Sequence, residues 1–170
     1  MFDDNVNKPD SKVDNGPSFQ YLTFSLGDEV FAMDIRSVRE IIQYASMTIV
    51  PLMPEFVRGV INLRGSVVPV IDLRARFGRS RAEVGKKTCV IIFDAVVEDE
   101  KVELGLLVDS VSEVIEIAVA HIEQPPQFGN TIRRDFIHGI GKVGKEFIVI
   151  LAPERALDIN EMASLAEQAA

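Results

Sequence analysis

The stretch that decides the fold runs from Gly59 to Ile71 and reads Gly-Val-Ile-Asn-Leu-Arg-Gly-Ser-Val-Val-Pro-Val-Ile. Residues 139–151 read Gly-Ile-Gly-Lys-Val-Gly-Lys-Glu-Phe-Ile-Val-Ile-Leu, a second version of the same hairpin. The corresponding positions are Gly59 and Gly139, Val60 and Ile140, Leu63 and Val143, and Val67-Val68 and Phe147-Ile148. Two apolar runs around a glycine-containing turn are typical of a β-hairpin.

A fainter repeat precedes each hairpin. Residues 31–34, Phe-Ala-Met-Asp, lead to Glu40-Ile41, and residues 106–109, Leu-Leu-Val-Asp, lead to Glu113-Val114. A repeat of this length is too long for a solenoid and indicates two similar β units, built in tandem or interleaved. Neither copy carries catalytic groups, so the pattern favours a binding module.

The size and composition of the chain limit its class. Its 170 residues fit one ordinary domain or two small barrels that share a boundary. Apolar residues make up 47% of the chain, which is enough for a core. No apolar run approaches the roughly 20 residues that span a bilayer, and the N-terminus has no signal-peptide features, so no direct membrane insertion is expected. The single cysteine, Cys89, is interpreted as a small buried side chain, and a reducing cytoplasm is the expected compartment.

The formal net charge of −8 argues against nucleic acid as a partner, because phosphate binding needs a basic surface. An oligonucleotide-binding barrel would also need aromatic platforms, and the chain has no Trp and only two Tyr. Between Arg58 and Lys87, eight Lys or Arg accompany only Asp72 and Glu83, a net charge of +6. This segment is either a solvated basic loop or a docking patch for an acidic protein surface.

Alternating and clustered apolar residues between turns predict a mostly β fold after a flexible tail at residues 1–17. An acidic turn at residues 98–100 joins two of the strands. Pro69 cannot donate a backbone hydrogen bond and indicates an edge strand or a bulge. The predicted strands are residues 19–26, 30–33, 57–62, 67–73, 88–97, 102–108, 111–117, 137–142 and 146–151.

Three helical segments are predicted from their caps. A short turn within residues 34–40 has Asp34 as N-cap, with Ile35 and Val38 facing inward. Asp72 is the expected N-cap of a second short helix that ends at Gly78. The C-terminal segment, residues 158–170, begins with capping-box spacing and continues with apolar residues at helical spacing, so it predicts a longer helix.

Catalytic constellations are missing from the sequence. His121 and His138, the only histidines, do not stand at metal-ligand spacing from a Cys, Asp or Glu pair. There is no nucleophile elbow and no Walker loop, and Gly139-Ile-Gly-Lys-Val-Gly opens a strand rather than a phosphate-binding helix. The chain is therefore expected to be no enzyme, to hold no metal and to need no cofactor.

Residues 59–78, from the quoted hairpin through Asp-Leu-Arg-Ala-Arg-Phe-Gly, closely resemble the signature of the CheW family of bacterial chemotaxis coupling proteins. Three further segments match in family order: residues 31–41, residues 105–114 and the Ile122-Glu-Gln-Pro-Pro loop. The resemblance extends from Phe19 to about Ala166 and includes the Gly-x-Gly-Lys hairpin.

The resemblance implies a fold of two interleaved five-stranded SH3-like β-barrels with short helices and a C-terminal helix, so that residues 18–157 form one domain of two barrel subdomains. It also implies a non-catalytic scaffold that joins the cytoplasmic hairpin tips of chemoreceptors to the regulatory domain of the histidine kinase CheA. Such a protein is cytoplasmic and associated with receptor arrays at the inner membrane. The alternative is a coupling protein of a chemosensory system that controls pili or another non-flagellar output.

Carried over by position, the receptor-binding groove involves Val38, Glu40, Gly59 and Arg64. For a functional Arg64 two arrangements are open: it pairs with Glu40 and fixes the shape of the groove, or it reaches a receptor carboxylate. The alternative is that Arg64 is merely a turn residue of the hairpin. Gly59 is interpreted as space for a receptor helix backbone. The apolar residues expected to line the trough are Ile35, Val38, Val57 and Val60, whereas the resemblance assigns no residues to the kinase surface.

Overall fold

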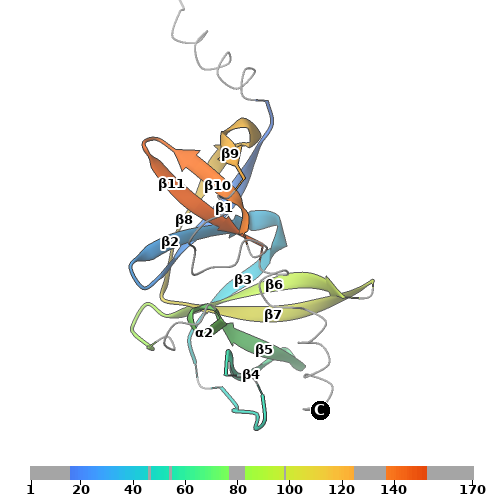
Figure 1. Cartoon of the computed structure of the whole chain (residues 1–170). Coiled ribbons are helices and arrows are strands. Elements are labelled where there is room, and N and C mark those ends of the chain that lie inside the picture. Colours follow the sequence, from blue (N-terminus) through green and yellow to red (C-terminus); the bar gives the residue numbers. More distant parts are fainter. Residues whose placement is uncertain are drawn as a thin grey trace, which may run out of the picture.

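The computed structural model describes residues 16–45, 47–53, 55–76, 83–97, 99–124 and 137–152. This part of the chain is mostly β, as the sequence predicts (Figure 1). The short helical segments are η1 (Ile35–Ser37), α2 (Leu73–Arg76) and η2 (Val119–His121). The strands are β1 (Ser18–Leu26), β2 (Glu29–Asp34), β3 (Val38–Gln43), β4 (Val57–Leu63), β5 (Ser66–Asp72), β6 (Cys89–Val97), β7 (Glu100–Val108), β8 (Ser110–Ala118), β9 (Ile122–Glu123), β10 (Ile137–Val143) and β11 (Glu146–Leu151).

The strands form two sheets of mixed direction. One has the order β8-β1-β2-β11-β10-β9 and the other the order β3-β6-β7-β5-β4. We call the first the terminal barrel, because both ends of the described chain contribute to it, and the second the central barrel. The prediction of two interleaved sheets is confirmed, and the terminal barrel contains the two-residue strand β9 in addition to the predicted strands.

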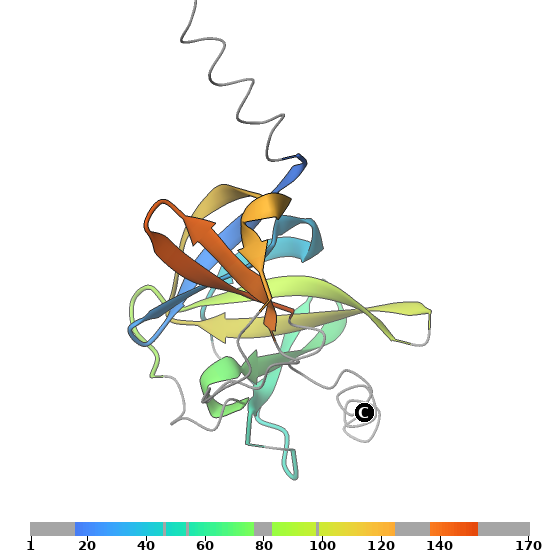
Figure 2. The same cartoon turned by 45° about the horizontal axis from the view of Figure 1, so that its top comes forward.

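Each sequence repeat contributes its first hairpin to the barrel of the other repeat. β1 and β2 pair with β8 and β11 of the second repeat, and β6 and β7 pair with β3 and β5 of the first. The two exchanged contacts β2–β11 and β7–β5 are both parallel, which is the same connection in each barrel. Figure 2 shows the long β6–β7 hairpin lying between the rest of the central barrel and the terminal barrel.

Backbone pairs close both barrels at equivalent positions. In the central barrel Val60 of β4 exchanges hydrogen bonds of 2.8 and 3.0 Å with Thr48, which follows β3. In the terminal barrel the equivalent residue Ile140 pairs with Glu123 of β9, and Gly141 pairs with Ile122. Val60 and Ile140, which are equivalent in the sequence repeat, therefore close their barrels through equivalent backbone pairs.

The core has three parts, and the largest lies between the barrels. Its buried side chains come from both sheets and include Phe24 and Phe31, whose rings stack with centroids 6.2 Å apart. The interior of the central barrel is lined by Val68, Val70, Val90, Ile92 and Leu107. The interior of the terminal barrel is lined by Tyr21, Ala32, Ile117 and Ile150. On β6, Val90 and Ile92 face the central barrel, whereas Ile91 and Phe93 face the core between the barrels, which is the period of two expected of a strand buried on both faces.

Pro69 lies in an interior strand, which corrects the expectation of an edge. β5 lies between β4 and β7. Pro69 is opposite Val60, which directs its own hydrogen bonds away from β5 to Thr48. The parallel ladder with β7 begins only at Val70. The missing N–H of Pro69 is thus required by neither neighbouring strand.

The segment around residue 38 is a strand, which the sequence interpretation missed. Asp34 caps η1 as predicted, since its carboxylate accepts a 2.8 Å hydrogen bond from the Arg36 backbone N–H. The helical turn ends at Ser37, however, and the chain continues directly as β3, paired with β6. β3 alternates charged and apolar residues in pairs, and this obscured its period of two.

Asp72 is the predicted cap of α2 and also a buried ion-pair partner. Its Oδ1 accepts hydrogen bonds of 3.0 and 3.3 Å from the backbone N–H groups of Arg74 and Ala75. Its Oδ2 lies 3.1 Å from the guanidinium of Arg58, and the Asp72 side chain is completely buried. The end of this helix at Gly78, the C-terminal helix (158–170) and residues 1–15 of the predicted tail lie outside the described residues.

We predict that Asp72→Ala lowers the free energy of unfolding by about 3–5 kcal/mol, because it removes the buried carboxylate that pairs with the mostly buried Arg58 guanidinium and also removes the cap of α2. Urea unfolding of the purified protein measures this change. The control is Asp94→Ala, whose partner Arg39 is half-exposed at 3.4 Å and whose loss costs less than about 1 kcal/mol. Equal losses in the two variants would contradict the structural role of the buried pair.

Candidate functional site

An ion pair between Glu40 and Arg64 connects β3 to the turn after β4. The Arg64 guanidinium lies 2.5 Å from the Glu40 carboxylate. The side chain of Arg64 is 63% exposed and that of Glu40 is 32% exposed, so both can be reached from solvent. The Glu40 carboxylate raises the pKa of Arg64 above its ordinary value, by hydrogen bonding and by charge. This pair is one of the two arrangements that the sequence left open for Arg64.

The turn itself fixes where the Arg64 side chain begins. Arg64 and Gly65 both have positive φ, 52° and 88°, as a tight hairpin turn requires at its two central positions. The side chain of Asn62 accepts a 2.9 Å hydrogen bond from the Gly65 N–H and holds the turn. A residue other than glycine costs conformational free energy at this positive φ. The ion pair of the Arg64 side chain with Glu40 offsets part of this cost.

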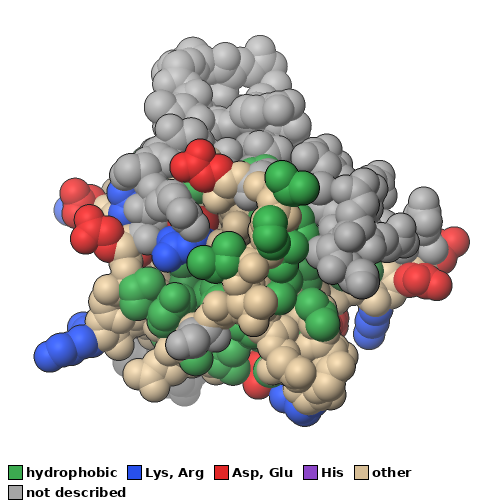
Figure 3. Space-filling model, turned by 90° about the horizontal axis from the view of Figure 1, so that it is seen from below, with side chains coloured by type: hydrophobic (Ala, Val, Ile, Leu, Met, Phe, Trp, Pro, Cys, Tyr) green, Lys and Arg blue, Asp and Glu red, His purple; other side chains and the backbone are tan. Residues whose placement is uncertain are grey.

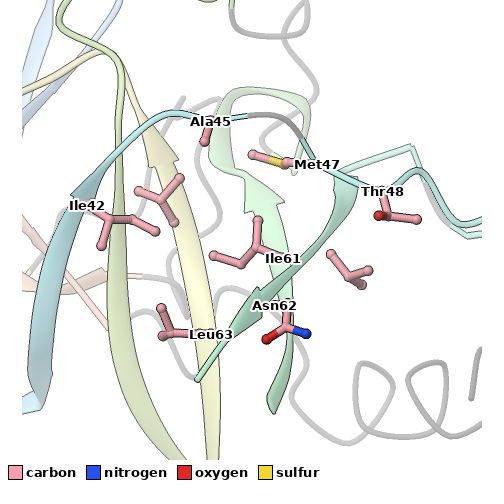
Figure 4. A pocket seen from close by; sticks show the side chains of 9 residues that line it. Ile42, Ala45, Met47, Thr48, Ile61, Asn62 and Leu63 are labelled. Atoms are coloured by element: carbon pink, nitrogen blue, oxygen red, sulfur yellow. The ribbon is translucent and has the colours of Figure 1, made fainter. Parts of the chain in front are cut away.

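A slot opens between β3 and β4 beside this ion pair. It has a volume of about 360 Å³, at the lower end of the range for ligand pockets. Its walls come from the two strands and from the segment that follows β3 (Figure 4). Val90 of β6, which is buried, also lines it. The lining residues are Ile42, Ala45, Met47, Thr48, Val60, Ile61, Asn62, Leu63 and Val90.

The slot is bounded at both ends along the strands. At one end the backbone bridge between Thr48 and Val60 joins its walls. At the other end the ion pair between Glu40 and Arg64 joins them. Between these two connections β3 and β4 have no ladder hydrogen bonds to each other in the described part of the chain. The slot is therefore a gap in the wall of the central barrel that leads into its apolar interior.

Packing within the chain itself explains why residue 59 is a glycine. A Cβ atom at this position would lie 2.6 Å from the Thr48 carbonyl oxygen and 3.2 Å from Met47 Cβ. The residue is buried. The sequence interpretation assigned this space to the backbone of a receptor helix, whereas in the structure the chain's own Met47-Thr48 segment occupies it. The equivalent Gly139 faces Ile122 and Glu123 in the same way, at 2.6 and 3.1 Å.

The remaining residues of the predicted trough divide into two groups. Val60 lines the slot with the ion pair at its end. Val57 is only 7% exposed and belongs to the core between the barrels, and Ile35 and Val38 pack against the same core. The structure thus brings Glu40, Val60 and Arg64 together and places the other three apolar residues mainly in a structural role.

Exposed apolar side chains gather on the face of the molecule that carries the β3–β4 connection (Figure 3). In that connection Leu52 is completely exposed, with a positive φ of 65°, and Ile49 is 79% exposed. On the central barrel Ile41 and Val67 are also exposed, at 41% and 69%. Sequence reasoning missed these residues and most of the slot, because β3 was not recognised and its apolar residues could not be assigned to a face.

Two arginines of the basic segment form ion pairs with carboxylates of the same chain. Arg58 pairs with buried Asp72, and Arg64 pairs with Glu40. The exposed residues Lys86 and Lys87 remain on the surface. Much of the rest of the segment lies outside the described residues, so the choice between a solvated loop and a docking patch stays open.

The described residues contain no group of three or more His, Cys, Asp or Glu side chains that could hold a metal ion. His121 lies on η2 and His138 on β10, both exposed. Across the same described ranges, no helix is long and apolar enough to cross a membrane.

Comparisons with known proteins agree over most of the chain. Residues 20–161 match the model of the CheW-like domain. Chemotaxis protein CheW of Klebsiella aerogenes is 34% identical over 144 residues, which are 85% of this chain and 84% of that protein. Chemotaxis protein CheW of Treponema pallidum is 32% identical over 154 residues, 89% of each chain. The crystal structure of the scaffolding protein TtCheW from Thermoanaerobacter tengcongensis is 39% identical, with a TM-score of 0.71 over 80% of this chain and 90% of that chain.

We predict that Gly59→Ala lowers the free energy of unfolding by about 1–3 kcal/mol, because its methyl group must displace the Thr48 carbonyl that closes the central barrel. Thermal or urea unfolding measures the loss. Gly85→Ala is the matched control, since the nearest atom to its new Cβ lies 3.9 Å away, and we expect a change within about 0.5 kcal/mol. An unchanged stability of Gly59→Ala would show that the Thr48 bridge yields without cost.

Proposed function

The chain belongs to the family of the CheW-like domain, and from this premise we propose that it couples chemoreceptors to the histidine kinase CheA in chemotaxis signalling. It is a non-catalytic scaffold of this family. The relatives that carry the name CheW are chemotaxis proteins, and the structural neighbour is a scaffolding protein. The receptor, the kinase and the residues that touch them are the proposed part.

The observation that carries the proposal is the exposed ion pair of Glu40 and Arg64 at the end of an apolar slot. Both residues fall at positions that the resemblance assigns to receptor binding. Glu40 lies on β3 and Arg64 in the turn after β4, and the fold brings the two side chains into contact at the end of the slot. Such an arrangement of apolar lining with charges at its rim suits an amphipathic helix, which presents an apolar stripe beside charged residues.

Arg64 is the proposed contact to the receptor. Its guanidinium always carries a positive charge and holds a planar set of donors that matches a carboxylate. Because the side chain is mostly exposed, it can exchange Glu40 for a carboxylate on a receptor helix or hold both. Glu40 keeps the side chain over the slot in the absence of a partner.

We propose that the scaffold raises the effective concentration of the receptor and the kinase relative to each other. A protein that holds a receptor tip on one face and the kinase regulatory domain on another makes their encounter intramolecular. A change in the receptor then alters the kinase through the coupling free energy of the two sites. We place this assembly on the cytoplasmic side of the inner membrane, where the receptor tips lie.

We predict that Arg64→Glu abolishes receptor-dependent stimulation of CheA while the free energy of unfolding stays close to that of the wild-type protein, since exposed ion pairs contribute little to stability. A reconstituted kinase assay and co-sedimentation with a receptor cytoplasmic fragment measure coupling and binding. The fragment and the kinase are each omitted in turn, so that the two contacts are scored separately.

Arg36→Glu is the matched control for this charge reversal. Arg36 is 67% exposed and pairs at 2.6 Å with Asp34, whose 32% exposure equals that of Glu40. We expect it to couple normally. If Arg64→Glu also couples normally, the site assignment is wrong. The double variant Glu40→Arg with Arg64→Glu restores the internal pair, and it regains coupling only if the pair acts by shaping the slot rather than by contacting the receptor.

A further inference from the structure

Met47 lies at the point where the central barrel closes. A Cβ atom at Gly59 would lie 3.2 Å from Met47 Cβ and 2.6 Å from the carbonyl oxygen of the next residue, Thr48. The same Thr48 carbonyl accepts the 2.8 Å hydrogen bond from the Val60 N–H that joins the barrel wall. The Met47 side chain packs against the buried interior of this barrel. It therefore supports the closing bridge from the interior side.

Ile122 holds the equivalent position in the terminal barrel. A Cβ atom at Gly139 of the second repeat would lie 2.6 Å from the Ile122 side chain and 3.1 Å from the carbonyl oxygen of Glu123. Glu123 in turn pairs with Ile140, and Ile122 packs against the interior of its own barrel. The two halves of the fold therefore close with different side chains, an isoleucine in the terminal barrel and Met47 in the central barrel.

The sulfur of Met47 can be reached from solvent, because the barrel wall beside it is open. In the terminal barrel a second residue pair, Ile122 with Gly141, continues the closure. Among the described residues of the central barrel the closing bridge stands alone, and the slot of about 360 Å³ opens beside it. Met47 lines this slot, and Figure 4 shows its side chain pointing into it. A small dissolved molecule therefore reaches the sulfur.

We propose that Met47 is a site of reversible oxidation, at which a peroxide converts the thioether to a sulfoxide and loosens the closure of the central barrel. In the reaction with hydrogen peroxide the sulfur lone pair forms an S–O bond and the O–O bond breaks. The departing oxygen takes up the proton of the transferred oxygen and leaves as water, so the sulfur loses the two electrons that the peroxide gains. Methionine sulfoxide reductases reverse the change. This oxidation is independent of the proposed function, because it involves neither the receptor nor the kinase.

A sulfoxide does not suit the place that the thioether fills. Oxidation turns a flexible apolar side chain into a polar one whose oxygen needs a hydrogen-bond donor. The buried side chains of the barrel interior against which Met47 packs are all aliphatic. Among the described residues that line the slot, only Thr48 and Asn62 carry polar side chains. Because burial of an unpaired polar group is unfavourable, the oxidised side chain turns to water and the bridge of Thr48 and Val60 loses its support.

The other sulfur atoms of the described residues lie in different surroundings. Met33 is completely buried in the core between the barrels, so a peroxide reaches it only when the protein opens. Met53 packs against the same core and takes no part in the closing bridge. The thiol of Cys89 donates a hydrogen bond to the Lys87 carbonyl, and a thiol oxidised to a disulfide or a sulfenic acid is restored by thiol reductants. These side chains serve as internal references for Met47.

Treatment of the purified protein with hydrogen peroxide tests the proposal. Peptide mass spectrometry measures the sulfoxide at each methionine, and amide hydrogen exchange measures the protection of the Val60 N–H in the closing bridge. We expect Met47 to oxidise at least about tenfold faster than Met33, which is protected by burial. Exchange at Val60 should accelerate roughly ten- to a hundredfold in the oxidised protein, while exchange at Ile140 in the terminal barrel stays unchanged. Methionine sulfoxide reductase restores the protection, whereas dithiothreitol does not.

Met47→Ile is the matched variant, because it places at this position the residue that the terminal barrel carries there. We expect the variant to keep the protection of Val60 under peroxide, although Met33, Met53 and Cys89 are all retained. Met53→Leu is the control for a second partly buried methionine, and we expect it to lose the protection of Val60 as the wild-type protein does.

Three results would overturn the proposal. The first is oxidation of Met47 no faster than that of Met33, and the second is a fully formed sulfoxide at Met47 with unchanged exchange at Val60. The third is an equal loss of protection at Val60 and Ile140, which would show general damage rather than opening of one barrel. If Met47→Ile does not fold, the time course in the wild-type protein decides, since exchange at Val60 must follow the sulfoxide at Met47 and not that at Met53.

Discussion

The core between the two barrels is the constraint on which the rest of the structure depends. It collects buried side chains from β1 and β2 of one barrel and from β6 and β7 of the other, the two hairpins that the repeats exchange. Within the described part of the chain, it has sixteen buried residues, against five inside the central barrel and four inside the terminal barrel. Since hydrophobic stabilisation follows buried apolar area, neither barrel holds most of its own stabilisation. The exchange of hairpins makes the two repeats a single unit.

The concentration of buried side chains between the barrels explains why the central barrel remains stable with a slot in its wall between β3 and β4. A barrel whose stability came from its own interior would lose much of it through a gap in the wall, because the interior contacts nearest the gap would be solvated. Here the shared core and the buried pair of Arg58 and Asp72 hold β4 and β5 in place from the other side. Among the described residues, β3 and β4 make no ladder hydrogen bonds to each other at the slot, and the exposed apolar residues Ile49 and Leu52 lie in the connection between them.

The sequence predicts the parts of this arrangement that are local. The paired hairpins follow from their repeated glycines and apolar runs, and the caps Asp34 and Asp72 follow from the preference of carboxylates for the first free N–H groups of a helix. The contact of Glu40 with Arg64 was one of two alternatives suggested by the resemblance, and the structure shows it. Parts that depend on distant partners were missed. The charged residues of β3 obscured its alternating pattern, and β9 is only two residues long. The glycine at position 59 is required by the Thr48 carbonyl, and no local sequence pattern connects these two residues.

β6 contributes both to the slot and to the core between the barrels. Its side chains alternate between Val90, which lines the slot and belongs to the interior of the central barrel, and Ile91, which lies in the core between the barrels. The lining of the slot is therefore only one residue away from the core between the barrels. Close-packed interiors transmit small displacements rather than absorbing them, because they contain few voids. The lining of the slot and the packing between the barrels are thus physically connected through adjacent residues of β6.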